Sequence, residues 1–355
     1  MSDKKDILNS DDISLLAGQR LMVGFEGVEL NLELKALIRD IKVAGIILFA
    51  INIKSAAQVK ELCKSAQDYA KSCNLPPLFI AIDQEGGKVA RLKKPDFTEF
   101  QGNPYIKDID DAKNFATIVA RELKSVNINM NFAPVMDFIP EPKDIPNIDD
   151  LRGNFESIMI NRAFHGTPEN VAKLGSCVID TFQKSGIMAV AKHFPGIGRT
   201  TRDSHLELPI LGQREADRKL MELSDLIPFK AAIKSNVAGI MLSHILYSAL
   251  DNELPASLSY NIAKRLLRDE MGYQGVVMTD DLDMKAIKFD IPTSIKHILN
   301  AEVDIALICH KGAAIETAFN EIKTLIATDE KFYQKAIESS QRIDSLKRRY
   351  LDNML

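Results

Sequence analysis

The chain alternates short, continuously apolar runs with longer segments whose apolar residues recur at helical spacing. The apolar runs are residues 19–25, 45–49, 77–83, 128–135, 187–193, 238–244, 275–280 and 303–309. The helical segments are residues 31–43, 55–72, 111–125, a stretch beginning near Pro168, 216–235, 261–271, 292–301 and 313–326. Continuously apolar runs are typical of parallel strands that are buried on both faces. About eight strand and helix pairs predict an α/β fold, a closed (β/α)₈ barrel of the TIM type.

An open, doubly wound sheet shows the same alternation and is the structural alternative. No change in composition marks a linker, so we expect residues 1–355 to form a single catalytic barrel domain. The segment 331–350 has an amphipathic pattern and predicts an additional C-terminal helix, packed on the outer face of the barrel.

Composition and charge exclude several kinds of partner. The 45 basic and 49 acidic residues are evenly spread and give a net charge of -4, so no strong field favours nucleic acid or an anionic membrane. The first ten residues are polar, and no later run approaches the roughly twenty apolar residues of a membrane span. We expect a cytoplasmic monomer.

The four cysteines, Cys63, Cys73, Cys177 and Cys309, lie far apart and indicate reduced thiols rather than a zinc site or a disulfide.

Residues capable of chemistry follow several of the predicted strands. They are Asp83, Glu85 and Arg91 after the third strand, Asn131 and Asp137 after the fourth, Lys192 and His193 after the fifth, His244 after the sixth, and Asp280 and Asp281 after the seventh. The carboxyl ends of the strands of a barrel converge on one mouth. Buried charges without partners are costly, so this many at strand ends predict a polar site.

Asp280 is the best candidate for a nucleophile. In the run VVMTDDLDM it is the first charged residue after the buried part of the strand, where a rigid strand can hold a carboxylate precisely. The alternative is that an aspartate here caps the next helix, and we assign that role to Asp281 or Asp283.

Asp203 and His205 lie two residues apart in the long loop that follows the fifth strand. In an extended segment their side chains point the same way, and a carboxylate beside an imidazole raises its pKa, as suits a general acid near neutral pH. Gly196 and Gly198 suggest a mobile flap that brings the pair over the mouth.

Two other chemistries use the same region. Lys192 is a candidate for a Schiff base, and His193, His205, His244 and Asp280 are candidate metal ligands, but neither pattern is specific. The glycine pair in DQEGGKVARL lacks a phosphate-loop pattern and instead predicts a sharp turn that presents Asp83 and Arg91 to a hydroxylated ligand. Arg162 is a further candidate donor.

Together these motifs resemble those of family 3 glycoside hydrolases, and in particular the single-domain bacterial β-N-acetylglucosaminidases of cell-wall recycling. The matching segments, in chain order, are DQEGGKVARL (83–92), NFAPVMDF (131–138), NRAF (161–164), KHFPGIGRTTRDSH (192–205), SHILYSALDNELPASLS (243–259) and MTDDLDM (278–284). The resemblance implies a TIM-type barrel with a retaining mechanism that needs no metal or organic cofactor. It implies that Asp280 is the nucleophile, that His205 supported by Asp203 is the acid/base, and that Asp83, Arg91, Arg162, Lys192 and His193 contact the sugar.

The function expected from this resemblance is removal of terminal N-acetylglucosamine from peptidoglycan-derived muropeptides. A β-glucosidase, a broader β-hexosaminidase and a sugar-binding barrel without turnover are the alternatives. The chain departs from the family pattern at Ile197, where a histidine is common, at Arg199 two positions later, and at Lys88, where arginine is frequent. We expect Ile197 to pack in place of the histidine.

Overall fold

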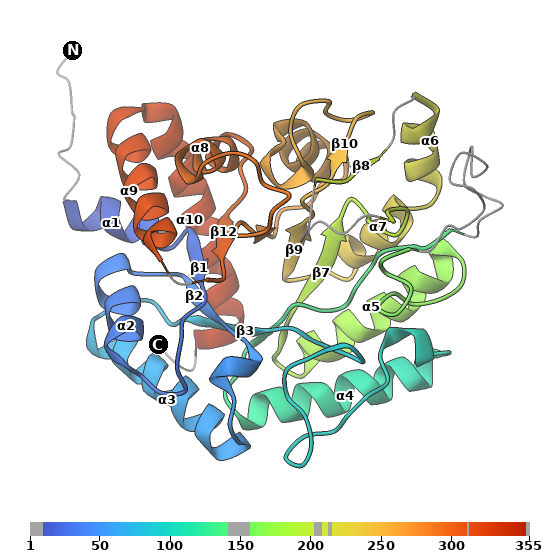
Figure 1. Cartoon of the computed structure of the whole chain (residues 1–355), viewed down its shortest axis with the longest axis horizontal. Helices are drawn as coiled ribbons and strands as arrows, with labels where there is room; N and C mark the ends of the chain where they lie inside the picture. Colours follow the sequence, from blue (N-terminus) through green and yellow to red (C-terminus); the bar gives the residue numbers. More distant parts are fainter. Residues whose placement is uncertain (1–9, 141–156, 202–207, 212–214, 311, 353–355) are drawn as a thin grey trace.

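Eight parallel strands form a closed barrel, as the sequence predicts (Figure 1). The computed structural model describes residues 10–140, 157–201, 208–211, 215–310 and 312–352. The barrel strands are β1 (Leu21–Val23), β2 (Gly45–Leu48), β3 (Phe79–Ile82), β6 (Met130–Asn131), β7 (Met188–Phe194), β9 (Gly239–Leu242), β11 (Val276–Asp281) and β12 (Ile305–Ile308). Parallel pairing of β1 with β12 closes the ring. All carboxyl ends therefore open on one mouth.

Helices surround the barrel and follow the predicted segments closely. They are α1 (Ser10–Gly18), α2 (Leu32–Ala36) continued by the π-helical η1 (Leu37–Ile41), α3 (Ala56–Ser72), α4 (Ile109–Ser125), α5 (Pro168–Lys184), α6 (Glu215–Leu223), α7 (Leu226–Lys234), the π-helical η7 (Asn261–Glu270), α8 (Ile291–Asn300), α9 (Ala313–Thr328) and α10 (Glu330–Leu351). Short 3₁₀ turns occupy Ala50–Asn52, Asn103–Tyr105 and Ala256–Leu258.

The single helix predicted over residues 216–235 is wrong, because the chain forms two helices there, α6 and α7. The break falls at Ser224 and Asp225. Pro228 explains it, since in a continuous helix its ring would clash with the carbonyl of residue 224 and its missing N–H would leave that carbonyl unpaired. The carboxylate of Asp225 is then free to accept from Arg199, with Oδ2 2.8 Å from Nε.

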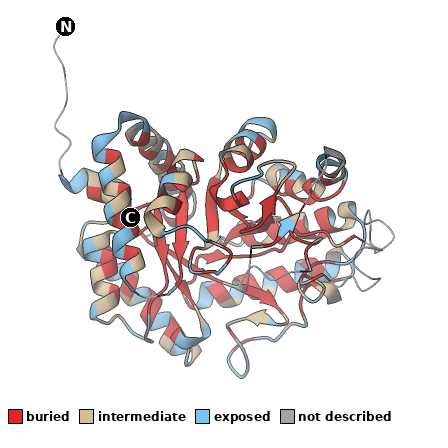
Figure 2. Ribbon diagram, turned by 45° about the horizontal axis from the view of Figure 1, so that its top comes forward, coloured by how far each residue is buried: buried red, intermediate tan, exposed pale blue. Residues whose placement is uncertain are grey.

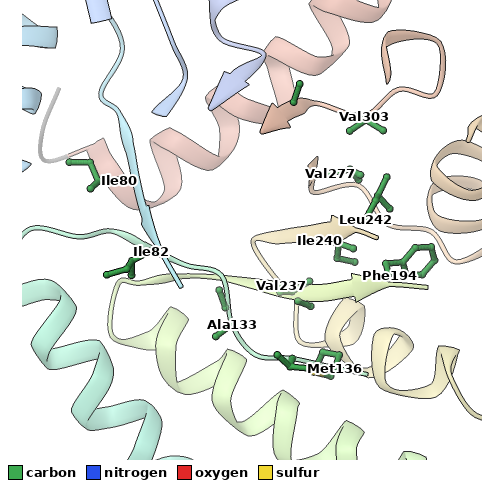
Figure 3. Close-up of a cluster of buried hydrophobic side chains, with 14 of the residues drawn as sticks. Ile80, Ile82, Ala133, Met136, Phe194, Val237, Ile240, Leu242, Val277 and Val303 are labelled. Atoms are coloured by element: carbon green, nitrogen blue, oxygen red, sulfur yellow. The ribbon is translucent and has the colours of Figure 1, made fainter. Parts of the chain in front are cut away.

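Alternate residues of each strand point into the barrel or outward to the helices. Phe79, Met130 and Met278 belong to the inner cluster, whereas Ile80 and Val277 belong to the outer one. Figure 3 shows part of this outer layer. Buried positions follow the strands and the inner faces of the helices in Figure 2. Strands packed on both faces hold the residues at their ends in fixed positions.

The C-terminal helix α10 does more than pack on the outer face, so that part of the prediction needs correction. Its residues Ile343, Leu346 and Leu351 join the cluster inside the barrel. Lys347 is buried, with Nζ 2.6 Å from Gln19 Oε1 and 5.0 Å from the centroid of the Phe79 ring. Burial lowers the pKa of Lys347 to about 7. The second half of α10 therefore covers the amino end of the barrel, opposite the mouth.

Two small sheets lie just beyond the barrel strands in the chain. An antiparallel hairpin pairs β4 (Gln84–Gly86) with β5 (Val89–Ala90), and β8 (Ile210–Leu211) pairs with β10 (Leu246–Tyr247). In the described ranges, no helix combines the length and the apolar character needed to cross a membrane.

Candidate active site

Lys192, near the end of β7, lies between two carboxylates, one directly after β3 and one in β4. Its Nζ is 2.7 Å from Asp83 Oδ1 and 2.6 Å from Glu85 Oε1, and the residue is only 2% exposed. Burial alone would lower the pKa of Lys192, but Asp83 and Glu85 raise it above its usual value. A Schiff base requires a neutral amine. The structure therefore does not favour Lys192 as a Schiff-base residue.

The glycine pair after β3 forms the sharp turn that the sequence predicts. Gly86 and Gly87 have φ angles of +86° and +61°, and a Cβ on Gly87 would lie 2.6 Å from the carbonyl oxygen of Gln101. Glycine is thus required there. The turn closes the β4–β5 hairpin and brings Arg91 Nη2 within 3.3 Å of Asp83 Oδ2. Both side chains remain partly exposed, at 25% and 15%.

Glu85 is the buried counter-ion of two basic residues. Besides Lys192, it binds Arg162, whose Nη2 and Nε lie 2.7 and 3.0 Å from its two oxygens. Burial would raise the pKa of Glu85, but Lys192 and Arg162 outweigh that effect and lower it to about 2. The sequence pattern placed Glu85 at the mouth but gave it no role. Its ion pairs with Lys192 and Arg162 form only when β4, β7 and the turn that contains Arg162 come together in the fold.

His193 follows Lys192, and its ring is hydrogen-bonded to the buried carboxylate of Asp137. Its Nδ1 lies 2.8 Å from Asp137 Oδ2, and its Nε2 lies 3.5 Å from Arg162 Nη2. His193 is 4% exposed and Asp137 is fully buried. The five residues expected to contact a sugar therefore form one connected cluster. Arg91 contacts Asp83, and Asp83 contacts Lys192. Glu85 joins Lys192 to Arg162, which in turn contacts His193.

Asp280 lies at the end of β11 and is half-buried. Its Oδ1 accepts a hydrogen bond from the backbone N–H of Asp281 at 2.8 Å. Burial would raise the pKa of Asp280, but His193, His244, the hydrogen bond from the Asp281 N–H and Lys192 together outweigh that effect and lower it below its usual value. The carboxylate thus lies within electrostatic reach of Lys192 and His193 from β7.

The helix cap assigned to Asp281 or Asp283 is wrong. The next helix, α8, is capped by Asp290, whose Oδ1 accepts from the backbone N–H of Thr293 at 2.8 Å. Asp281 instead accepts from the backbone N–H of Cys309 at 3.0 Å and joins β11 to the end of β12. Several residues separate β11 from α8, so an aspartate directly after the strand lies too early to cap that helix.

His244, after β9, is engaged at both ring nitrogens. Nδ1 lies 2.7 Å from Ser257 Oγ and Nε2 lies 2.8 Å from the carbonyl oxygen of Asp281. Among the described residues, the one group close enough to hold a metal is Asp281, Asp283 and His310, which differs from the set that the sequence suggested. The structure does not bring His193, His244 and Asp280 together as metal ligands, and His205 lies outside the described residues.

Asp203 and His205 both lie outside the described residues. The preceding part of their loop is described and is hydrogen-bonded to neighbouring segments at three points. Ile197 N donates to Asp137 Oδ1 at 2.9 Å, Tyr247 Oη donates to the carbonyl of Gly196 at 2.8 Å, and Arg199 binds Asp225.

Ile197 is 4% exposed and packs in the core, as expected.

Burial raises the pKa of Asp225 to about 6 in spite of Arg199. The sequence pattern did not mark Asp225 or Tyr247 as partners of this loop. The acidic residue three positions before Pro228 was an available signal for a break in the helix.

A closed parallel barrel with carboxylates, basic side chains and imidazoles at the carboxyl ends of its strands has the architecture of a TIM-barrel enzyme. Within that class, the chain belongs to glycoside hydrolase family 3. The family described as Glycosyl hydrolase family 3 N terminal domain matches residues 16–346.

Individual relatives agree with this assignment. Beta-hexosaminidase A of Pseudoalteromonas piscicida is 40% identical over 298 residues, which cover 78% of this chain and 47% of the relative. Beta-hexosaminidase of Alkalilimnicola ehrlichii is 32% identical over 313 residues, covering 85% of this chain and 84% of the relative. This chain thus spans about half the length of the first relative and most of the second.

Solved structures show the same likeness. A glycoside hydrolase family 3 β-N-acetylglucosaminidase from Paenibacillus sp. FPU-7 superimposes with a TM-score of 0.85 and is 34% identical, covering 96% of this chain and 63% of that protein.

Proposed function

We propose that the protein is a retaining exo-β-N-acetylglucosaminidase that hydrolyses terminal N-acetylglucosamine from peptidoglycan-derived muropeptides through a covalent glycosyl-enzyme intermediate. The observation that carries the proposal is the position of the Asp280 carboxylate at the end of β11, where nearby basic side chains, among them Lys192 of β7, lower its pKa in spite of burial. The relatives named beta-hexosaminidase and the β-N-acetylglucosaminidase structure support the choice of sugar.

Asp280 acts in this proposal as the nucleophile. Its carboxylate attacks the anomeric carbon while the bond to the leaving oxygen breaks, and a lowered pKa keeps it available for attack. His205, paired with Asp203, protonates the leaving oxygen and then removes a proton from the water that releases the sugar. The roles of Asp203 and His205 rest on the family resemblance.

The remaining residues hold the sugar. Asp83, Arg91 and Arg162 are the partly exposed members of the cluster, so their free donor and acceptor positions are available to hydroxyl groups. Lys192 keeps one ammonium hydrogen beyond those that serve Asp83 and Glu85. A rigid, charged set of donors and acceptors is suited to fixing the ring relative to Asp280.

Hydrolysis of two aryl glycosides tests the proposal. The purified protein is expected to release the phenol from an aryl N-acetyl-β-glucosaminide with a higher kcat/KM than from the matching aryl β-glucoside, and the Asp280→Ala variant is expected to release neither. A preference for the glucoside would point to a β-glucosidase. Absence of turnover with both substrates would indicate a sugar-binding barrel, and either result would overturn the proposal.

A further inference from the structure

The Asp137 carboxylate lies behind His193 and accepts three hydrogen bonds. It follows β6, is fully buried, and faces N–H groups of β7 and of the loop beyond it. Oδ1 accepts from the backbone N–H of His193 at 3.3 Å and from the backbone N–H of Ile197 at 2.9 Å. Oδ2 lies 2.8 Å from His193 Nδ1. The two oxygens thus have different partners.

The contact between Asp137 Oδ2 and Nδ1 determines which ring nitrogen of His193 carries the hydrogen. A carboxylate has acceptors only, so the short contact with Oδ2 requires a hydrogen on Nδ1. In the neutral imidazole Nε2 is then an acceptor. The group that faces Nε2 is Nη2 of Arg162, a donor, at 3.5 Å. Both neighbours of the ring therefore favour the same tautomer.

We propose that Asp137 is a positioning residue that fixes His193 in the Nδ1–H tautomer and so presents Nε2 as a hydrogen-bond acceptor to Nη2 of Arg162, which orients that guanidinium toward a sugar at the mouth of the barrel. The proposal rests on the proposed function for the identity of the ligand. Asp137 does not touch the sugar itself, because it is fully buried behind the ring. In a carboxylate–histidine pair the carboxylate sets both the orientation and the tautomer of the imidazole ring.

The two oxygens of Asp137 make asparagine an informative replacement. The backbone N–H groups of His193 and Ile197 both need an acceptor at the Oδ1 position, so the amide oxygen of asparagine will stay there. Its NH₂ group then faces His193 Nδ1. A donor at that place forces Nδ1 to become the acceptor and moves the hydrogen to Nε2, where it opposes Arg162.

The test compares the wild type with Asp137→Asn by ¹⁵N NMR of the histidine rings. The chain has six histidines, and the His193→Gln variant identifies the signal of His193. We expect hydrogen on Nδ1 in the wild type and on Nε2 in Asp137→Asn. Asp225→Asn is the matched control, because Asp225 is another buried carboxylate at the same loop but accepts from Arg199 and Ser224. It should leave the His193 signal unchanged.

Kinetics distinguish positioning from a merely structural role. Asp137→Asn is expected to reduce kcat/KM for the aryl N-acetylglucosaminide about 10- to 100-fold, a loss like that seen when the hydrogen-bond partner of a metal-binding histidine is replaced. In the His193→Gln background the same change should alter kcat/KM no more than about twofold, whereas independent effects would multiply.

A wild-type His193 with hydrogen on Nε2 would overturn the proposal without any variant. Equal effects of Asp137→Asn in both backgrounds would also overturn it. The NMR result is read whether or not the protein cleaves the aryl substrate, so failure of the proposed function is a separate observation.

Discussion

Replacement of Asp280 by asparagine is expected to reduce kcat for an aryl N-acetylglucosaminide by at least about 10,000-fold, the scale of loss when a covalent nucleophile is removed. The amide has nearly the same shape as the carboxylate but does not form a glycosyl ester. Its oxygen can still accept from the backbone N–H of Asp281, so the end of β11 should keep its conformation. Steady-state kinetics measures the loss, and calorimetric titration with N-acetylglucosamine should show retained binding.

Asp281→Asn is the matched control for this prediction. Asp281 is the adjacent aspartate, and its Oδ1 accepts from the backbone N–H groups of Asp283 and Cys309. An asparagine oxygen can accept both bonds, so we expect a far smaller loss of kcat. Comparable losses in the two variants would contradict a specific role for Asp280.

Glu85→Gln is expected to lower the free energy of unfolding at pH 7 by about 3 kcal/mol, because a buried charge that binds two cations is removed. The effect should depend on pH. The pKa of Glu85 falls from an ordinary value near 4.5 to about 2 in the folded protein. Its stabilisation is therefore complete above about pH 4.5 and is lost as the pH falls toward 2. Urea unfolding between pH 7 and 3 should show a steeper decline for the wild type than for the variant.

Glu99→Gln provides the comparison for Glu85. Glu99 lies 3.5 Å from Lys94, and the two side chains are 50% and 69% exposed. An exposed pair of this kind contributes less than about 1 kcal/mol, so its removal should change stability little. Similar destabilisation by the two variants would show that the buried cluster around Glu85 is not the source of the effect.

The barrel was predictable because strands buried on both faces leave continuous apolar runs and the intervening helices leave a distinct period. The same signal did not show the break between α6 and α7, since helical spacing continues across Ser224 and Asp225 while Pro228 interrupts the backbone bonds. It predicted that α10 has an apolar face but not that Leu346 and Leu351 cover the amino end of the barrel.

For the candidate site, strand-end position was the informative signal. It brought Asp83, Lys192 and His193 to one mouth correctly. The roles of Glu85 and Asp137 depend on distances between residues more than fifty positions apart, which spacing along the chain does not encode. The cap assigned near Asp281 failed for a related reason, because the start of α8 depends on the length of the loop before it.

Covalent trapping tests the central claim most directly. An activated 2-fluoro sugar slows release of a glycosyl-enzyme intermediate, and peptide mass spectrometry then locates the attached sugar. We expect a single sugar on the carboxylate of Asp280 and no label on the Asp280→Asn variant. A sugar attached to any other residue would contradict the assignment of Asp280 as the nucleophile.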